Sequence, residues 1–246
     1  MERLKPAENP ARPARDVLDL VDRHIESLYV VDEMGRLRVI NDFEGTPPPR
    51  LSIVRSSAGN RCLLSDQLPD DLCNELVALA ALEPVAADVA PWPVYRERYR
   101  ALLESHAAVF SEYGGPAFVL PERECASENS ARILGPTDQR LLEAHFAWLS
   151  QEFADAEPVS GVIEDGAVVA ICHCARRRTA AVEAGVETAP AYRGRGLAQH
   201  ATARWASAMY AANMRPLYSA SWANSASLSV AAALGARCYA VDFNLT

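Results

Sequence analysis

The sequence predicts an α/β protein built on a mixed sheet. Some segments alternate apolar and polar residues as strands do, while others repeat apolar residues at helical spacing. In the C-terminal half a strand, a glycine-containing loop, a helix and a second strand follow one another, which is the order of a parallel βαβ crossover. The chain has 246 residues, 50% of them hydrophobic, so it can bury a core without disulfides or metal.

Composition argues against several classes of partner. The net charge is −8, which disfavours nonspecific nucleic-acid binding. The longest apolar runs are far shorter than the roughly 20 residues that cross a bilayer. The first residues lack the apolar stretch of a secretory signal and carry acids that a mitochondrial presequence avoids. We therefore expect no nucleic-acid or membrane partner and a cytoplasmic location.

The first 115 residues are expected to form a tail and a mixed α/β domain. Prolines among polar residues predict a flexible tail over residues 1–15, and Asp16 is a suitable N-cap for the next helix. The domain 16–115 carries no motif that indicates a reaction. Its predicted helices cover 16–28, 69–82 and 94–110, and its predicted strands cover 28–31, 37–40, 51–55 and 61–64.

The C-terminal half, residues 116–246, is expected to form a second domain after Gly114-Gly115-Pro116. Asp165-Gly166 lies between two apolar runs and is a strong hairpin signal. The predicted strands cover 117–120, 158–164, 167–175, 181–188, 217–222 and 237–245, and the predicted helices cover 137–153, 196–212 and 225–234.

Cysteine and histidine positions favour structural roles. No pair of cysteines has the CxxC spacing of a zinc site, so we expect reduced, mostly buried cysteines and no metal. Cys172 and Cys174 share one face of a predicted strand, and His173 occupies the other. The five histidines have no nucleophile pattern beside them and are expected to be structural. The cysteines are Cys62, Cys73, Cys125, Cys172, Cys174 and Cys238.

The loop containing Gly194 and Gly196 indicates an anion site, because glycines between a strand and a helix let backbone amides approach a phosphate. A P-loop is excluded, since its motif needs a lysine and the only lysine is Lys5. A dinucleotide fingerprint needs a third glycine near Gln199 and an acid about 20 positions further on, and the chain has neither.

Two motifs in the C-terminal half resemble those of the GNAT N-acetyltransferase superfamily. Arg193, Gly196 and Ala198 fit its acyl-CoA signature, Gln/Arg-x-x-Gly-x-Gly/Ala. Asn224-x-x-Ser227, followed by a helix and Leu-Gly-Ala, resembles its second motif, which normally ends in Leu-Gly-Phe. The resemblance covers residues 116–246 and implies a GNAT-like acyl-CoA-binding fold there. Within the superfamily, the segment is most similar to the zwittermicin A resistance branch.

The resemblance implies acetyl-CoA as acyl donor. Backbone amides of the glycine loop would bind the pyrophosphate, and arginines would add charge-assisted contacts. Backbone groups at the splayed end of the strand before the loop would pair with pantetheine and polarise the thioester carbonyl. The implied binding residues are Val186, Thr188, Arg193, Gly194, Arg195, Gly196, Leu197, Ala198, Asn224 and Ser227.

The implied reaction is direct attack of a small-molecule primary amine on the thioester, which requires a base. Glu183 and Glu187 are the candidates, and Glu183 is favoured because it falls in mid-strand among small and apolar residues. A purely structural carboxylate remains an alternative for each. The superfamily often has a tyrosine acid seven residues after the asparagine, where this chain has Ala231. Ser227, Tyr218 or Tyr239 could replace it, or the thiolate could leave unaided.

Three functions therefore compete: an N-acyltransferase for small amines, a CoA-binding module with a sensory or scaffold role and little catalysis, and a protein acetyltransferase. Residues 1–115 carry 19 acids and 13 bases, so most of the negative charge lies there. That half could cover the acceptor cleft, be a degenerate copy of the C-terminal domain, or form a homodimer. If it lines the acceptor cleft with carboxylates, a cationic acceptor is favoured.

Overall fold

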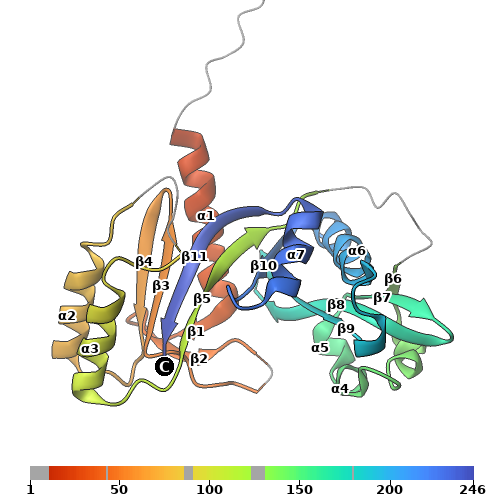
Figure 1. The fold of residues 1–246 in the computed structure, drawn as a ribbon, viewed down its shortest axis with the longest axis horizontal. Coiled ribbons are helices and arrows are strands. Elements are labelled where there is room, and N and C mark those ends of the chain that lie inside the picture. Colours follow the sequence, from red (N-terminus) through yellow and green to blue (C-terminus); the bar gives the residue numbers. More distant parts are fainter. Residues whose placement is uncertain (1–10, 43, 86–90, 123–130, 179) are drawn as a thin grey trace, which may run out of the picture.

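The computed structural model describes residues 11–42, 44–85, 91–122, 131–178 and 180–246. Over these residues the chain forms one large mixed sheet with helices on both faces, plus a two-stranded hairpin (Figure 1). The predicted α/β class is confirmed. The helices are α1 (Ala11–Leu28), α2 (Asp70–Ala80), α3 (Arg96–His106), α4 (Ala147–Gln151), α5 (Phe153–Ala156), α6 (Leu197–Ala211) and α7 (Ser225–Leu234), with 3-10 turns η1 (Pro136–Leu141) and η2 (Pro190–Tyr192). The strands are β1 (Tyr29–Val31), β2 (Leu37–Ile40), β3 (Leu51–Ser56), β4 (Gly59–Leu64), β5 (Glu112–Val119), β6 (Arg132–Leu134), β7 (Val159–Glu164), β8 (Ala167–Arg177), β9 (Ala181–Thr188), β10 (Arg215–Ser219) and β11 (Arg237–Leu245).

Strands from both halves of the chain share the large sheet. In the described residues its order is β4-β3-β11-β5-β10-β9-β8-β7-β6. β9 and β10 are parallel, as the predicted βαβ crossover through α6 requires, and the other neighbours pair antiparallel. The expected boundary between residues 115 and 116 falls inside β5, and the last strand, β11, pairs with β3. The two halves are thus joined by backbone hydrogen bonds, and their division into domains stays a prediction.

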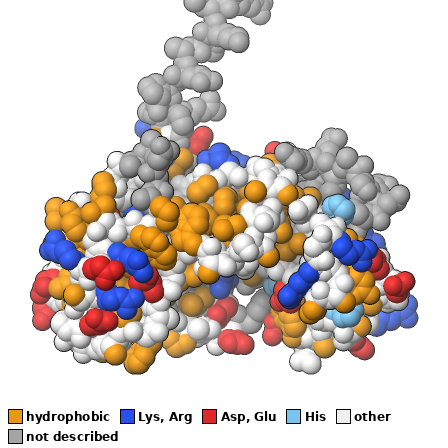
Figure 2. All heavy atoms as spheres, viewed as in Figure 1, with side chains coloured by type: hydrophobic (Ala, Val, Ile, Leu, Met, Phe, Trp, Pro, Cys, Tyr) orange, Lys and Arg blue, Asp and Glu red, His pale blue; other side chains and the backbone are white. Residues whose placement is uncertain are grey.

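Helix α1 lies on one face of the sheet, and α6, α2 and α3 lie opposite it. Ala181 packs with α1, whereas its neighbour Val182 packs beneath α6, so these helices lie on opposite faces. Likewise Val54 faces α1 and Ile53 faces α2 and α3. The short helices α4 and α5 cover β7 and β8. Figure 2 shows mixed acidic and basic side chains over the α2 and α3 side, with hydrophobic side chains across the middle.

The strongest local signals in the sequence are confirmed. Asp165 and Gly166 both have positive φ, 50° and 78°, as a tight hairpin turn between β7 and β8 requires. Cys172 and Cys174 pack in the core beneath α6, while His173 lies on the other face against Trp148. Cys125 and the first ten residues of the predicted tail lie outside the described residues.

Several predicted bounds are wrong. The helix expected over 137–153 is instead η1 followed by α4 and α5. The apolar side chains of this segment have helical spacing and pack in one core, but successive short turns carry them rather than one helix. They are Leu142, Phe146, Leu149 and Phe153. The helix expected over 94–110 ends at His106, because the chain continues in extended conformation. The first helix begins at Ala11, five residues before its expected N-cap, and β6 had no clear sequence signal.

No helix in the part of the chain that the structure describes combines the length and apolar character needed to span a membrane.

Candidate active site

The parallel strands β9 and β10 separate at their carboxyl ends. Their pairing runs from Arg215 opposite Ala181 to Leu217 opposite Glu183 and then stops, while β9 continues to Thr188 along β8. Residues 184–188 therefore have no paired strand on the β10 side within the described ranges. Helices α6 and α7 begin just beyond the two separating ends. This opening exposes backbone groups that a ligand with amide bonds can pair with.

The loop before α6 presents free backbone amides at the same place. Gly194 and Gly196 adopt left-handed conformations, with φ of 75° and 77°, which non-glycine residues rarely adopt. Gly196 is the N-cap of α6 and no side chain caps the helix. The first amides of this 15-residue helix thus point outward, and the helix dipole adds positive potential there. Both features favour a phosphate.

A cavity of about 570 Å³ fills the space between the separating strands, the glycine loop and α7. Asn224 caps α7, because its side-chain oxygen accepts a hydrogen bond from the Ser227 amide at 3.0 Å. Ten of the twelve predicted site residues line the cavity: Val186, Glu187, Thr188, Arg193, Gly194, Gly196, Leu197, Ala198, Asn224 and Ser227. The sequence did not mark Tyr192, Gln199, Ala226, Ser229 and Val230, which complete the wall together with Tyr218.

Comparison with known proteins agrees with this geometry. A family model described as GNAT acetyltransferase matches residues 151–240, which include β8 to β10, the loop, α6 and α7. These residues belong to the GNAT superfamily. No curated protein sequence matches the chain.

One solved structure extends the likeness to the whole fold. A GCN5-related N-acetyltransferase-like protein from Streptococcus suis is 17% identical with a TM-score of 0.53, covering 97% of this chain and 100% of that chain. A putative GNAT-family acetyltransferase from Novosphingobium aromaticivorans is 24% identical with a TM-score of 0.47, covering 56% of this chain and 65% of that chain. The first similarity shows that the N-terminal half belongs to a fold shared over the full length.

Two of the predicted site residues, Arg195 and Glu183, lie outside the cavity between β9, the glycine loop and α7. Arg195 forms a bidentate ion pair with Glu164 on the hairpin, at 2.9 and 2.8 Å, so its guanidinium is already engaged. Glu183 is 2% exposed and lies on the opposite face of β9, beneath α1. It is also the last residue of β9 paired with β10, which places it at the apex of the opening.

Glu183 belongs to a buried polar cluster that joins both halves of the chain. The Ser219 hydroxyl donates to one oxygen of the Glu183 carboxylate at 2.6 Å, and the other oxygen has no hydrogen-bond partner. This second oxygen, unpaired among the described residues, lies 4.0 Å from Nδ1 of His24 on α1, whose Nε2 is 2.9 Å from Asp242 on β11. Burial disfavours the imidazolium, but Asp242 and Glu183 outweigh it and raise the pKa of His24. The cluster could not be predicted from the sequence, because its members lie far apart along the chain.

Glu187 has a different environment from Glu183. Its side chain is exposed and lines the cavity between β9, the glycine loop and α7. Partial burial of the carboxyl raises the pKa of Glu187, and nearby Arg193 opposes the shift. The irregularity in strand pairing lies in β8, between Cys174 and Arg176, so β9 keeps its alternation from Glu183 to Glu187.

Tyr218 lines the cavity and is one of the residues that could replace the missing tyrosine acid. Its ring packs in the same core as Ala231, the residue found where the superfamily often has tyrosine. The phenol is buried, its oxygen has no hydrogen-bond partner among the described residues, and burial raises the pKa of Tyr218. Within the described ranges, no group of three or more His, Cys, Asp or Glu side chains is arranged to hold a metal ion.

Proposed function

We propose that the chain transfers an acetyl group from acetyl-CoA to the primary amine of a small molecule. The cavity between the separated ends of β9 and β10 carries this proposal, because it joins an unpaired strand edge to a helix N-terminus. The strand edge suits the amide groups of pantetheine, and the amides after Gly196 suit a pyrophosphate. Arg193, which is exposed beside the loop, adds positive charge.

Glu183 is the proposed general base. The neutral amine nitrogen attacks the thioester carbonyl carbon, the carbon–sulfur bond breaks, and the proton leaving nitrogen passes to the carboxylate. The unpartnered oxygen of Glu183, at the apex of the opening, is available for that proton. Release of the CoA thiolate needs little help near neutral pH, since a thiol has a pKa of about 8.5. Tyr218 is the residue in the cavity wall best suited to assist it.

Calorimetry with acetyl-CoA, followed by thiol release across an amine panel, tests the function. We expect binding and amine-dependent thiol release. Protein that binds neither acetyl-CoA nor CoA would contradict the proposal. Glu183→Gln should lose at least about 100-fold in kcat while keeping acetyl-CoA affinity, whereas Glu187→Gln should lose much less. The opposite order would assign the base to Glu187.

A second candidate is a CoA-binding module without efficient chemistry. Ala231 favours it, because the phenol that often protonates the thiolate in this superfamily is absent at that position. The same experiment separates the two: acetyl-CoA binding without thiol release from any amine indicates the module, and turnover abolished by Glu183→Gln indicates the enzyme.

A further inference from the structure

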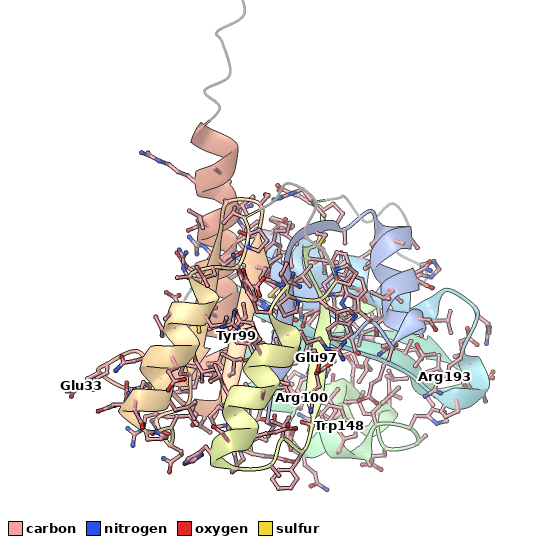
Figure 3. All side chains as sticks on the ribbon, turned by 60° about the vertical axis from the view of Figure 1, so that its left-hand side comes forward. Glu33, Glu97, Tyr99, Arg100, Trp148 and Arg193 are labelled. Carbon is pink, nitrogen blue, oxygen red and sulfur yellow. The ribbon has the colours of Figure 1, made fainter. Side chains whose placement is uncertain are left out.

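A second cavity lies on the face of the sheet opposite the proposed CoA cavity. Its volume is about 370 Å³, and its floor is β8. One wall comes from the segment after β2, in the N-terminal half, and the other from α4 and the residue that follows it. Figure 3 shows Trp148 of this cavity well separated from Arg193 of the glycine loop. The lining residues are Asp42, Glu44, Trp148, Glu152, His173, Ala175 and Arg176.

The charge of this cavity suits a cation. Three carboxylates, Asp42, Glu44 and Glu152, face one guanidinium, that of Arg176. Burial would raise the pKa of Asp42, but hydrogen bonds from Thr46 outweigh it and lower the pKa, so this carboxylate is ionised at neutral pH. The cavity therefore holds net negative charge.

A buried, unpartnered imidazole completes the cavity. His173 is 5% exposed, and its Nδ1 has no hydrogen-bond partner in the part of the chain that the structure describes. Burial lowers the pKa of His173 to about 4, so the ring is neutral and offers a hydrogen bond rather than a charge. Trp148 lies edge-on to it at 5.3 Å between ring centroids and is 38% exposed, which leaves indole surface for a cation. The neutral ring and the indole thus form the uncharged part of the cavity lining, beside its three carboxylates.

The cavity adjoins the part of β9 where acyl transfer is proposed. The His173 ring lies over Gly185, since a Cβ there would come within 2.2 Å of Nε2. Gly185 precedes Val186, which lines the CoA cavity from the other side of the strand. Arg176 is the register partner of Glu183. A ligand in the second cavity would therefore approach the acyl group from the side that carries the proposed base.

We propose that this second cavity binds the acceptor amine, and that the acceptor is a small molecule with at least two amino groups. The inference rests on the proposed function. One amine must be uncharged to attack the thioester carbon, with its proton passing to Glu183 and the thiolate leaving. A second amine, still an ammonium, is held by the carboxylates of Asp42 and Glu152 and by the face of Trp148.

Three acceptors of matched size test the class: putrescine, n-butylamine and γ-aminobutyrate, each with saturating acetyl-CoA in a thiol-release assay. We expect kcat/KM for putrescine to exceed that for n-butylamine about tenfold, with γ-aminobutyrate the poorest. Equal or better use of n-butylamine or γ-aminobutyrate would overturn the inference. Calorimetry of putrescine with the CoA-loaded protein gives a second readout, and no binding at millimolar concentration would also overturn it.

Variants locate the site. Asp42→Asn and Glu152→Gln should each raise the KM for putrescine about tenfold, leaving the KM for acetyl-CoA unchanged. Glu143→Gln, an exposed acid on the same segment as Glu152 but outside the cavity, is the matched control and should change neither. Unchanged putrescine KM in both cavity variants would refute the site while the acyltransferase stands. If the unmodified protein did not bind acetyl-CoA, the proposed function itself would be refuted.

Discussion

The buried imidazole of His173 makes a quantitative prediction about stability and pH. Its folded-state pKa of about 4 lies below the ordinary value of 6.5, so as pH falls the unfolded chain takes up this proton first. Stability from the neutral ring is complete above pH 6.5 and is lost as pH falls toward 4. The difference of about 2.5 pKa units corresponds to about 3 kcal/mol. The side chain is almost fully buried, so solvent screening reduces this little.

The contribution of the neutral His173 ring to stability can be measured by urea unfolding. The wild type and His173→Gln are unfolded at several pH values from 7.5 to 4, and unfolding is followed by tryptophan fluorescence. Carboxylate titrations are common to both proteins and cancel in the difference between their unfolding free energies. We expect the wild type to lose about 3 kcal/mol relative to the variant between pH 6.5 and 4. His24 cannot mimic the effect, because its raised pKa places its loss of stability above pH 6.5. A difference that stays constant with pH would refute the reasoning.

Three glycine substitutions test the loop and the sheet, with Gly35→Ala as the control for the loop. Gly194→Ala and Gly35→Ala place alanine at φ near 75° and 78° with no crowding, so each should cost about 1 kcal/mol of unfolding free energy. Calorimetry should show weaker acetyl-CoA binding for Gly194→Ala but not for Gly35→Ala. If both variants changed acetyl-CoA binding equally, the assignment of the site to the glycine loop would be contradicted. Gly115→Ala should cost at least about 3 kcal/mol in urea unfolding, since its Cβ would lie 1.9 Å from the Ala220 carbonyl oxygen. A loss under about 1 kcal/mol would show that the strands can separate.

Much of the cavity proposed to bind acetyl-CoA could be predicted because its determinants are local. A left-handed glycine, a helix N-terminus and a strand end are all specified within the stretch from Thr188 to Ala198, and each carries a conformational signature. The Asp165-Gly166 hairpin was predictable for the same reason. The helical spacing over 137–153 led to the wrong prediction of one long helix. Apolar periodicity indicates which side chains face a core, but it does not show whether a single continuous helix carries them.

The environment of Glu183 could not be predicted, because its partners come from distant parts of the chain. His24 and Asp242 are 218 residues apart in sequence and meet only when α1 packs across β9 and β11. No local pattern distinguishes these residues from ordinary surface polar residues of a helix and a strand. Similarly, nothing in the sequence places Asp42 near Trp148, since the loop after β2 reaches α4 only in the folded chain.

These contacts bear on what the N-terminal half contributes. It adds β3 and β4 to the edge of β11, lays α1 over the face of β9 that carries Glu183, and supplies two carboxylates to the second cavity. The cavity proposed to bind acetyl-CoA, by contrast, is lined by residues between 186 and 230 alone. The proposed donor cavity is therefore built from the C-terminal half alone, whereas the proposed acceptor cavity takes its lining from both halves. On this reasoning, substitutions of Asp42 and Glu44 in the N-terminal half should alter which amine is used, while leaving acetyl-CoA affinity unchanged.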